Sequence, residues 1–287
     1  MIISASRRTD IPAYYSDWFF NRLAAGFVKV ANPFNPRQVR EVSLRPQDVD
    51  CFVFWSKNSA PLLQRIGALQ AYKFYFQFTL NPYDQDVEPG LPEKSELLKT
   101  FSVLAQAVGA ARVVWRYDPI VVTPKYDIAW HKRSFATYCH ALAGKTRRVV
   151  ISFVDAYRGS AAGLRELGAV SFTEEMLGEI AGSFAETATE FGLSIESCCE
   201  PVDLRCFNIQ PGRCIDDRII AELTGRNLEL PRDRNQRPGC GCVASVDIGA
   251  YSTCPAGCRY CYANKGVARV VANCRRHDPS SPFLLPP

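Results

Sequence analysis

Short apolar runs alternate with segments of helical spacing along this chain, and this alternation constrains its fold more than any other sequence feature. The apolar runs are rich in β-branched and aromatic residues, which is typical of strands buried on both faces. They cover residues 2–5, 27–30, 51–55, 74–80, 113–117, 149–154, 193–197 and 244–249. Because helices separate most of them, consecutive strands are expected to run in the same direction and to form a parallel sheet.

The segments between the strands carry the apolar spacing of amphipathic helices. They cover residues 15–25, 60–69, 94–108, 127–142 and 173–191. The last of them has clear end signals, since Thr173 suits an N-cap and Gly192 a C-terminal stop. Strands and helices in this number predict an α/β fold, a parallel (β/α) barrel of the TIM-barrel kind that is complete or partial. A doubly wound open sheet is the alternative.

Polar side chains directly follow most of the predicted strands. In a parallel barrel the carboxyl ends of the strands meet at one mouth, and sites are built there. The residues in such positions are Arg7, Arg8, Asp10, Asn32, Asn35, Lys57, Asn58, Asn81, Asp118, Asp155 and Glu200. We expect many of them to line a common site.

The composition suits a protein that buries a full core, with 287 residues, 47% of them hydrophobic and 22% charged. No run of about eighteen apolar residues occurs, and the N-terminus carries no apolar signal region, so neither a membrane span nor a secretory signal is predicted. We therefore expect a cytoplasmic protein without a membrane partner. The net charge of +5 is modest and leaves nucleic acid open as a partner without indicating it.

Cysteine is distributed unevenly, because ten of the 12 cysteines lie in the last third of the chain. Secreted disulfide scaffolds are usually small, whereas this chain has a long core-forming body and no export signal, so metal or cluster ligation is the better interpretation. From Cys198 onward the regular alternation gives way to a loop-rich stretch. We expect a barrel body over residues 1–197 and a cysteine-rich iron–sulfur region over residues 198–287 that completes the barrel.

Three of these cysteines form the motif Cys254-x3-Cys258-x2-Cys261 directly after the last predicted strand. Thiolates at these offsets can bind three irons of a cube-shaped [4Fe–4S] cluster and leave the fourth iron without a protein ligand. Such an open iron suits a reactive ligand. Structural zinc, completed by a fourth thiolate from the same region, is the alternative.

In this motif the chain resembles the radical SAM superfamily, whose three-cysteine loop follows a barrel strand and usually has an aromatic residue just before the third cysteine. Tyr260 occupies that position here. The resemblance implies S-adenosylmethionine bound at the open iron, Tyr260 beside the adenine, cleavage to a 5′-deoxyadenosyl radical, and a reductant such as a flavodoxin or ferredoxin. The superfamily places the loop after its first strand, and a circularly permuted barrel would bring the loop of this chain into the same mouth.

More widely, the chain resembles the family catalogued as domain of unknown function 1848. The resemblance runs over nearly the whole length, through the segments SASRRTDIP, FWSKN, FQFTLN, WRYDPI, CID, QRPGCGC and CPAGCRYCYAN. No reaction is assigned to that family, so the resemblance supports the expectations about fold and cofactor and names no substrate.

Four further thiols are candidates for a second site, namely Cys199, Cys214, Cys240 and Cys242. Four thiolates suit a second [4Fe–4S] cluster. Structural zinc and buried free thiols are the alternatives. Cys198 can replace Cys199, since adjacent residues on a strand point to opposite faces.

The charged residues at the strand ends complete the candidate site. Arg7 and Arg8 suit recognition of a carboxylate or phosphate, and with Asn81 they are expected to bind the cofactor. The candidate catalytic residues, which are expected to face the cofactor or the substrate, are Lys57, Arg116 and Asp118. A buried salt bridge that holds the barrel together is the alternative role for these charges.

The sequence thus predicts a radical enzyme acting on a small-molecule substrate that is anionic or nucleotide-like. A second hypothesis is a non-catalytic barrel, stapled by zinc, that binds a ligand or nucleic acid. A third is a hydrolase that uses Asp118, Asp155 and Glu200 as acid and base.

Overall fold

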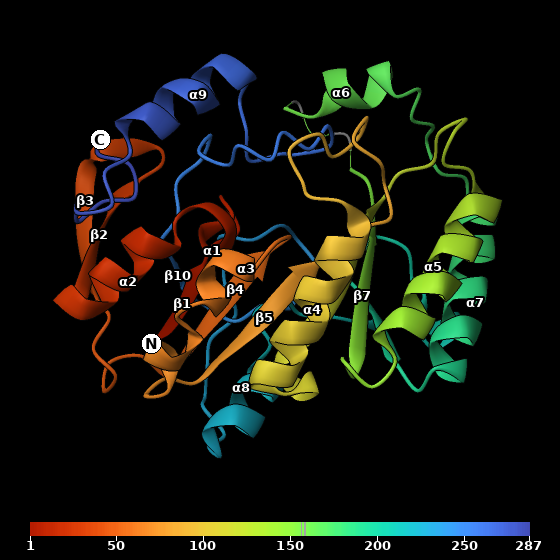
Figure 1. Ribbon diagram of the computed structural model, residues 1–287. Coiled ribbons are helices and arrows are strands. Elements are labelled where there is room, and N and C mark those ends of the chain that lie inside the picture. Colours follow the sequence, from red (N-terminus) through yellow and green to blue (C-terminus); the bar gives the residue numbers. More distant parts are fainter. Residues whose placement is uncertain (156, 158) are drawn as a thin grey trace.

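The computed structural model describes residues 1–155, 157 and 159–287, and its main element is an eight-stranded sheet (Figure 1). All neighbouring strands of this sheet pair in parallel, in the order β10, β1, β4, β5, β6, β7, β8, β9. Their bounds are β1 Ile2–Ala5, β4 Cys51–Ser56, β5 Phe74–Thr79, β6 Val113–Ile120, β7 Arg148–Phe153, β8 Ser194–Ser197, β9 Gln210–Pro211 and β10 Val246–Asp247. In the described part of the chain β9 and β10 are the two edges of the sheet and do not pair with one another. The predicted parallel α/β sheet is confirmed.

The strand predicted over residues 27–30 lies outside this sheet, and that part of the prediction is wrong. β2 (Phe27–Asn32) pairs antiparallel with β3 (Asn35–Ser43) in a separate two-stranded hairpin. Parallel strands require a long crossover, and the connection from β2 to β3 is far too short for one. The eighth place in the parallel sheet is taken by β9, which is only two residues long and contains a proline, so it gives no strand signal in the sequence.

Each of the five segments with helical spacing contains a helix. The bounds of the helices are α1 Ile11–Tyr14, α2 Ser16–Ala25, α3 Ala60–Leu63, α4 Lys94–Val108, α5 Ile128–Leu142, α6 Ala161–Glu166, α7 Glu174–Glu190, α8 Asp217–Thr224 and α9 Val267–Arg276, of which α1, α6, α8 and α9 lie outside these segments. The hydroxyl of Thr173 accepts a hydrogen bond from the backbone N–H of Met176 at 3.2 Å, which confirms the predicted N-cap of α7. The helix predicted over residues 60–69 is instead divided into α3 and a short 3-10 turn (Ile66–Leu69). None of the helices in the described ranges is long and apolar enough to cross a membrane.

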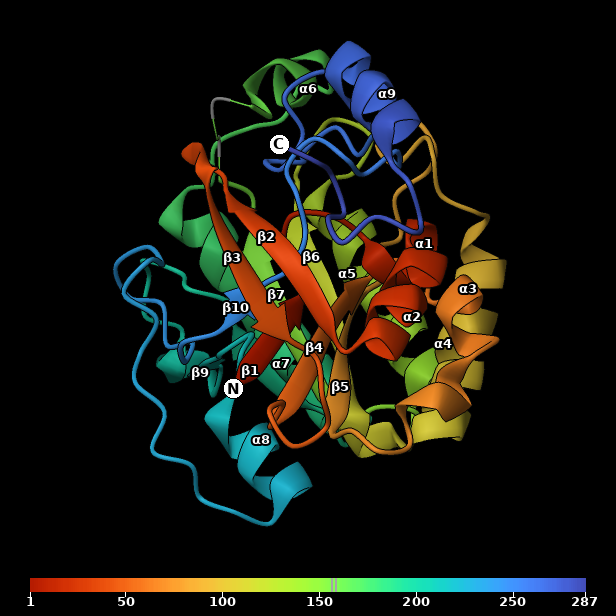
Figure 2. The same ribbon diagram turned by 90° about the vertical axis from the view of Figure 1, so that its left-hand side faces the viewer.

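The two faces of the sheet are covered in different ways. On one face, aromatic strand residues such as Phe54 and Phe76 lie in the main hydrophobic core. Helices α2, α4, α5 and α7 cover this face (Figures 1 and 2). On the other face, Tyr75 and Val150 pack against the segment that contains Ile215 and Ile219. The hydroxyl of Tyr75 donates to the carbonyl of Cys214 at 2.7 Å. This second face is therefore filled by the loop-rich region, and β5 fixes where Cys214 lies.

The edge between β10 and β1 is held by one carboxylate, that of Asp247. Its oxygens accept hydrogen bonds from the hydroxyls of Ser4 and Ser6, each at 2.7 Å, and from the backbone N–H of Arg7 at 2.8 Å. Gly249 follows β10 and packs so closely on Ser6 that a Cβ atom there would lie 2.6 Å from the Ser6 Cβ. The short strand β10 thus depends on side-chain contacts as much as on its two residues of backbone pairing.

Replacement of Gly249 by alanine tests this edge. We expect Gly249→Ala to lower the free energy of unfolding by about 1–3 kcal/mol, because the added methyl group overlaps Ser6. Gly67→Ala is the control, since a Cβ at Gly67 meets no atom within 4 Å. Thermal or denaturant unfolding measures both. Equal stability of the two variants would contradict the close packing of β10 against the turn after β1.

Candidate functional site

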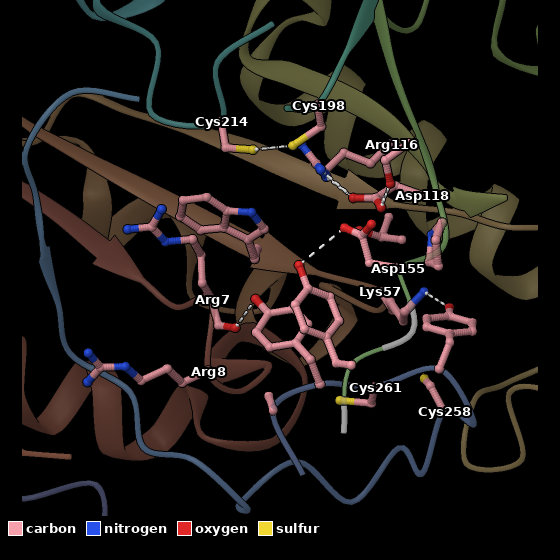
Figure 3. A pocket seen from close by; sticks show the side chains of 18 of the residues that line it. Arg7, Arg8, Lys57, Arg116, Asp118, Asp155, Cys198, Cys214, Cys258 and Cys261 are labelled. Atoms are coloured by element: carbon pink, nitrogen blue, oxygen red, sulfur yellow. Dashed lines mark hydrogen bonds and ion pairs between the residues drawn. The ribbon is translucent and has the colours of Figure 1, made fainter. Parts of the chain in front are cut away.

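A cavity of about 470 Å³ lies at the carboxyl ends of the parallel strands. Residues that end or follow β1, β4, β6, β7 and β8 line it, together with the loops before and after β10. Figure 3 shows Cys258 and Cys261 at one end of the cavity and Cys198 and Cys214 at the other, with charged side chains between them. The strand-end position matches the site expected for a parallel α/β sheet.

The loop after β10 brings Cys254, Cys258 and Cys261 to the cavity wall. Backbone hydrogen bonds join this loop to the segment after β5, from Arg259 N to the Val87 carbonyl and from Gly90 N to the Ala256 carbonyl, both at 2.9 Å. These bonds hold the loop in place although it contains no helix or strand.

Burial raises the pKa of each of these thiols. The pKa of Cys254 rises to about 12, and that of Cys258 rises well above its usual value even though the Lys57 ammonium partly counteracts burial. Burial also raises the pKa of Cys261. In the absence of a metal these groups are therefore thiols at neutral pH, and any metal that binds them must release their protons.

Lys57 and Tyr260 meet at a buried carboxylate that the sequence did not single out, Glu88. The Lys57 ammonium lies 2.8 Å from Glu88 Oε1 and 2.8 Å from the Tyr260 hydroxyl, and Lys94 also contacts Glu88. The Asn81 amide donates to the same Tyr260 hydroxyl at 3.1 Å. Burial raises the pKa of Glu88, but the two ammonium groups outweigh it and hold the pKa below the usual value. Two predicted cofactor-binding residues and one predicted catalytic residue thus share a single network.

Arg116 and Asp118 form a second network on β6. Arg116 Nε donates to Asp118 Oδ2 at 2.9 Å, and Arg116 Nη1 lies 3.1 Å from the Cys214 sulfur. The other oxygen of Asp118 accepts from the Ser152 hydroxyl. Burial raises the pKa of Asp118, but Arg116 outweighs it, so the carboxylate stays ionised. The pair is a buried salt bridge that also faces the cavity.

Arg7 and Arg8 both line the cavity, as expected for residues after β1. The Arg7 guanidinium lies 5.8 Å from the centre of the Trp55 ring and 3.4 Å from an Asp233 oxygen. The Arg8 guanidinium lies 5.2 Å from the centre of the Tyr251 ring. Since aromatic rings and single carboxylates leave most of their N–H groups free, both arginines can bind an anion in the cavity.

The acids of the hydrolase hypothesis are not arranged as a pair. Asp155 is bound to Arg237, and Asp118 is bound to Arg116. Glu200 accepts a hydrogen bond from the backbone N–H of Phe153 at 3.1 Å, and burial raises its pKa to about 8. Asp155 and Asp118 are among the residues that line the cavity, and Glu200 is not.

The comparison with known families covers most of the chain. Residues 2–263 match the family model described as domain of unknown function (DUF1848). The chain belongs to the DUF1848 family. No curated protein and no solved structure matches it.

The four remaining predicted ligands also reach the cavity of this DUF1848 protein, namely Cys199, Cys214, Cys240 and Cys242. Cys198 lines it too. Within the described residues no three His, Cys, Asp or Glu side chains are gathered around one point as the ligands of a single metal ion are. Cys274 lies apart from the second group, with its sulfur 3.4 Å from the Thr253 carbonyl beneath the three-cysteine loop.

Sequence reasoning missed Glu88 and Arg237. Glu88 lies in the connection between β5 and α4, where neither spacing nor motif marks it. Arg237 precedes the GCGC segment and contacts Asp155 and the Cys198 carbonyl. Its place in the segment QRPGCGC was the only available signal.

The Glu88 network gives a prediction about stability. Glu88→Gln leaves the Lys57 ammonium partly uncompensated, and we expect it to lower the free energy of unfolding by roughly 2–4 kcal/mol at pH 7. Glu186→Gln, at an exposed position of α7, is the control. Denaturant unfolding measures both.

The same difference should depend on pH. Because the pKa of Glu88 is lowered in the folded state, its contribution is complete above the usual pKa of 4.5 and is lost as the pH falls through the folded-state value. The gap between the wild type and Glu88→Gln should therefore shrink in acid. A gap that stays constant from pH 7 to about pH 3 would contradict the ionised state of Glu88.

Proposed function

We propose that this protein is a radical S-adenosylmethionine enzyme that carries a [4Fe–4S] cluster on Cys254, Cys258 and Cys261. The observation that carries the proposal is that all three thiols of the motif line the same cavity as the strand-end arginines and Lys57. A purely structural metal site that only held the loop in place would not require its ligands to face this cavity. The proposal includes a substrate that is anionic or nucleotide-like and an external reductant such as a flavodoxin or ferredoxin.

The donor set fits such a cluster. Three thiols on one loop would supply soft ligands to three irons and leave the fourth iron without a protein ligand, and all three thiols line the cavity. When bound, the cluster would supply the electron that cleaves S-adenosylmethionine to methionine and a 5′-deoxyadenosyl radical.

The position of the loop in the sheet supports a permuted barrel. β10 pairs in parallel with β1, so the loop after β10 lies beside the turn that carries Arg7 and Arg8. The segments beside the two sheet edges also meet, because Val243 N donates to the Ile215 carbonyl at 3.1 Å. We infer that the sheet approaches a barrel whose seam is closed by loop contacts rather than by strand pairing.

The side chains around the cavity have separable tasks in this proposal. Tyr260 is held by Lys57, Asn81 and Glu88, so its ring is fixed in orientation beside the three-cysteine loop. Arg7 and Arg8 supply cations for a carboxylate or phosphate. Because Lys57 is bound to Glu88, it acts as a fixed positive charge rather than as a general base.

The first test is anaerobic reconstitution with iron and sulfide, followed by incubation with dithionite and S-adenosylmethionine. We expect wild-type protein to form 5′-deoxyadenosine, measured by chromatography, and Cys258→Ala to form none. Cys206→Ala is the matched control, because Cys206 is exposed and lies outside the residues that line the cavity. A protein that binds zinc and leaves S-adenosylmethionine intact would instead support the zinc-stapled binding module.

A further inference from the structure

Four cysteines from three separate segments line the cavity in addition to the three-cysteine loop. Figure 3 shows two of them, Cys198 and Cys214, at the end of the cavity opposite that loop. Cys198 follows β8, Cys214 follows β9, and Cys240 and Cys242 precede β10. The radical mechanism proposed above uses none of them. These cysteines come from distant parts of the chain and line the same cavity. They are therefore candidates to bind a second ligand.

Direct contacts connect three of the four cysteines, Cys198, Cys214 and Cys242. The sulfurs of Cys198 and Cys214 lie 3.3 Å apart. The sulfur of Cys242 accepts hydrogen bonds from the backbone N–H groups of Cys214 at 3.2 Å and Ile215 at 3.4 Å. Cys240 lies two residues before Cys242 and lines the same cavity. Backbone N–H groups directed at a sulfur are a recurring way to stabilise a thiolate that binds a metal cluster.

The same contacts distinguish Cys198 from its neighbour Cys199. The thiol of Cys199 is directed to the Pro238 carbonyl at 3.5 Å, and its backbone adopts the left-handed conformation with φ 55°. Cys198 alone of the two reaches the sulfur of Cys214. Cys198 is therefore the better candidate for the fourth ligand, whereas the sequence favoured Cys199.

Arg116 provides the charge that such a site needs. Its Nη1 lies 3.1 Å from the Cys214 sulfur, and the guanidinium is almost completely buried. A set of four thiolates around iron or zinc carries a net negative charge, and a buried cation in contact with one ligand offsets part of it. No other described side chain joins the β6 network to these thiols as directly.

We propose that Cys198, Cys214, Cys240 and Cys242 bind a second [4Fe–4S] cluster in the wall of the cavity. Four protein thiolates occupy all four irons, so this cluster has no open position and suits electron transfer or the shaping of the cavity rather than the binding of S-adenosylmethionine. This second cluster is not part of the proposed radical reaction and does not depend on it. The sulfurs of two thiolates bound to different irons lie farther apart than the 3.3 Å between Cys198 and Cys214, so binding of the cluster requires one of these two side chains to turn.

The arrangement favours a cluster over a lone zinc ion. A structural zinc site gathers four ligands tightly around one ion and is closed to solvent. Here all four thiols line an open cavity. A cluster would also link the segments after β8 and β9 to the segment before β10.

The test removes the first site so that the second can be measured alone. The triple variant Cys254→Ala, Cys258→Ala, Cys261→Ala is reconstituted anaerobically with iron and sulfide, and iron, sulfide and zinc are determined. We expect about four irons per chain and the visible absorption of a [4Fe–4S] cluster. Further replacement of Cys198 and Cys214 by alanine should remove this iron, whereas Cys199→Ala in the triple background should leave it unchanged.

Three results would overturn the proposal. The triple variant could bind no iron, it could bind about one zinc per chain instead, or it could lose Cys198 and Cys214 to a disulfide without taking up metal. Circular dichroism of each variant separates loss of a ligand from loss of the fold. In the converse variant, with Cys198 and Cys214 replaced and the three-cysteine loop intact, 5′-deoxyadenosine formation reports on the first cluster alone, so failure of one proposal is distinguishable from failure of the other.

Discussion

The pairing of β10 with β1 is the contact on which the site depends. Two residues of backbone pairing and the hydrogen bonds to Asp247 attach the end of the chain to its first strand. This contact places the three-cysteine loop beside Arg7 and Arg8, more than two hundred residues away in the sequence. Without it the thiols and the strand-end cations would not share a cavity.

Buried charges organise the space between the two groups of thiols. Lys57 is held by Glu88 near Cys258, and Arg116 is held by Asp118 near Cys214. Removing either carboxylate would leave a cation without its partner in a poorly solvated wall. These pairs therefore fix the positions of the charged groups in the wall of the cavity.

The sequence predicted the parallel sheet well because its signals are local. Seven of the eight predicted strand runs lie in the sheet, since each is a continuous buried apolar segment. The run at residues 27–30 has the same composition, and only the short connection to β3 shows that it forms a hairpin. β9 was missed because two residues carry no periodicity.

The sequence alone determined the spacing of Cys254, Cys258 and Cys261 and the likeness that this motif carries, because these residues are close together in the chain. The tertiary structure decided which distant groups meet. It brought Glu88 to Lys57 and Tyr260, and it selected Cys198 over Cys199 as the neighbour of Cys214. Contacts of this kind follow from strand order and backbone direction, which residue patterns a few positions long do not encode.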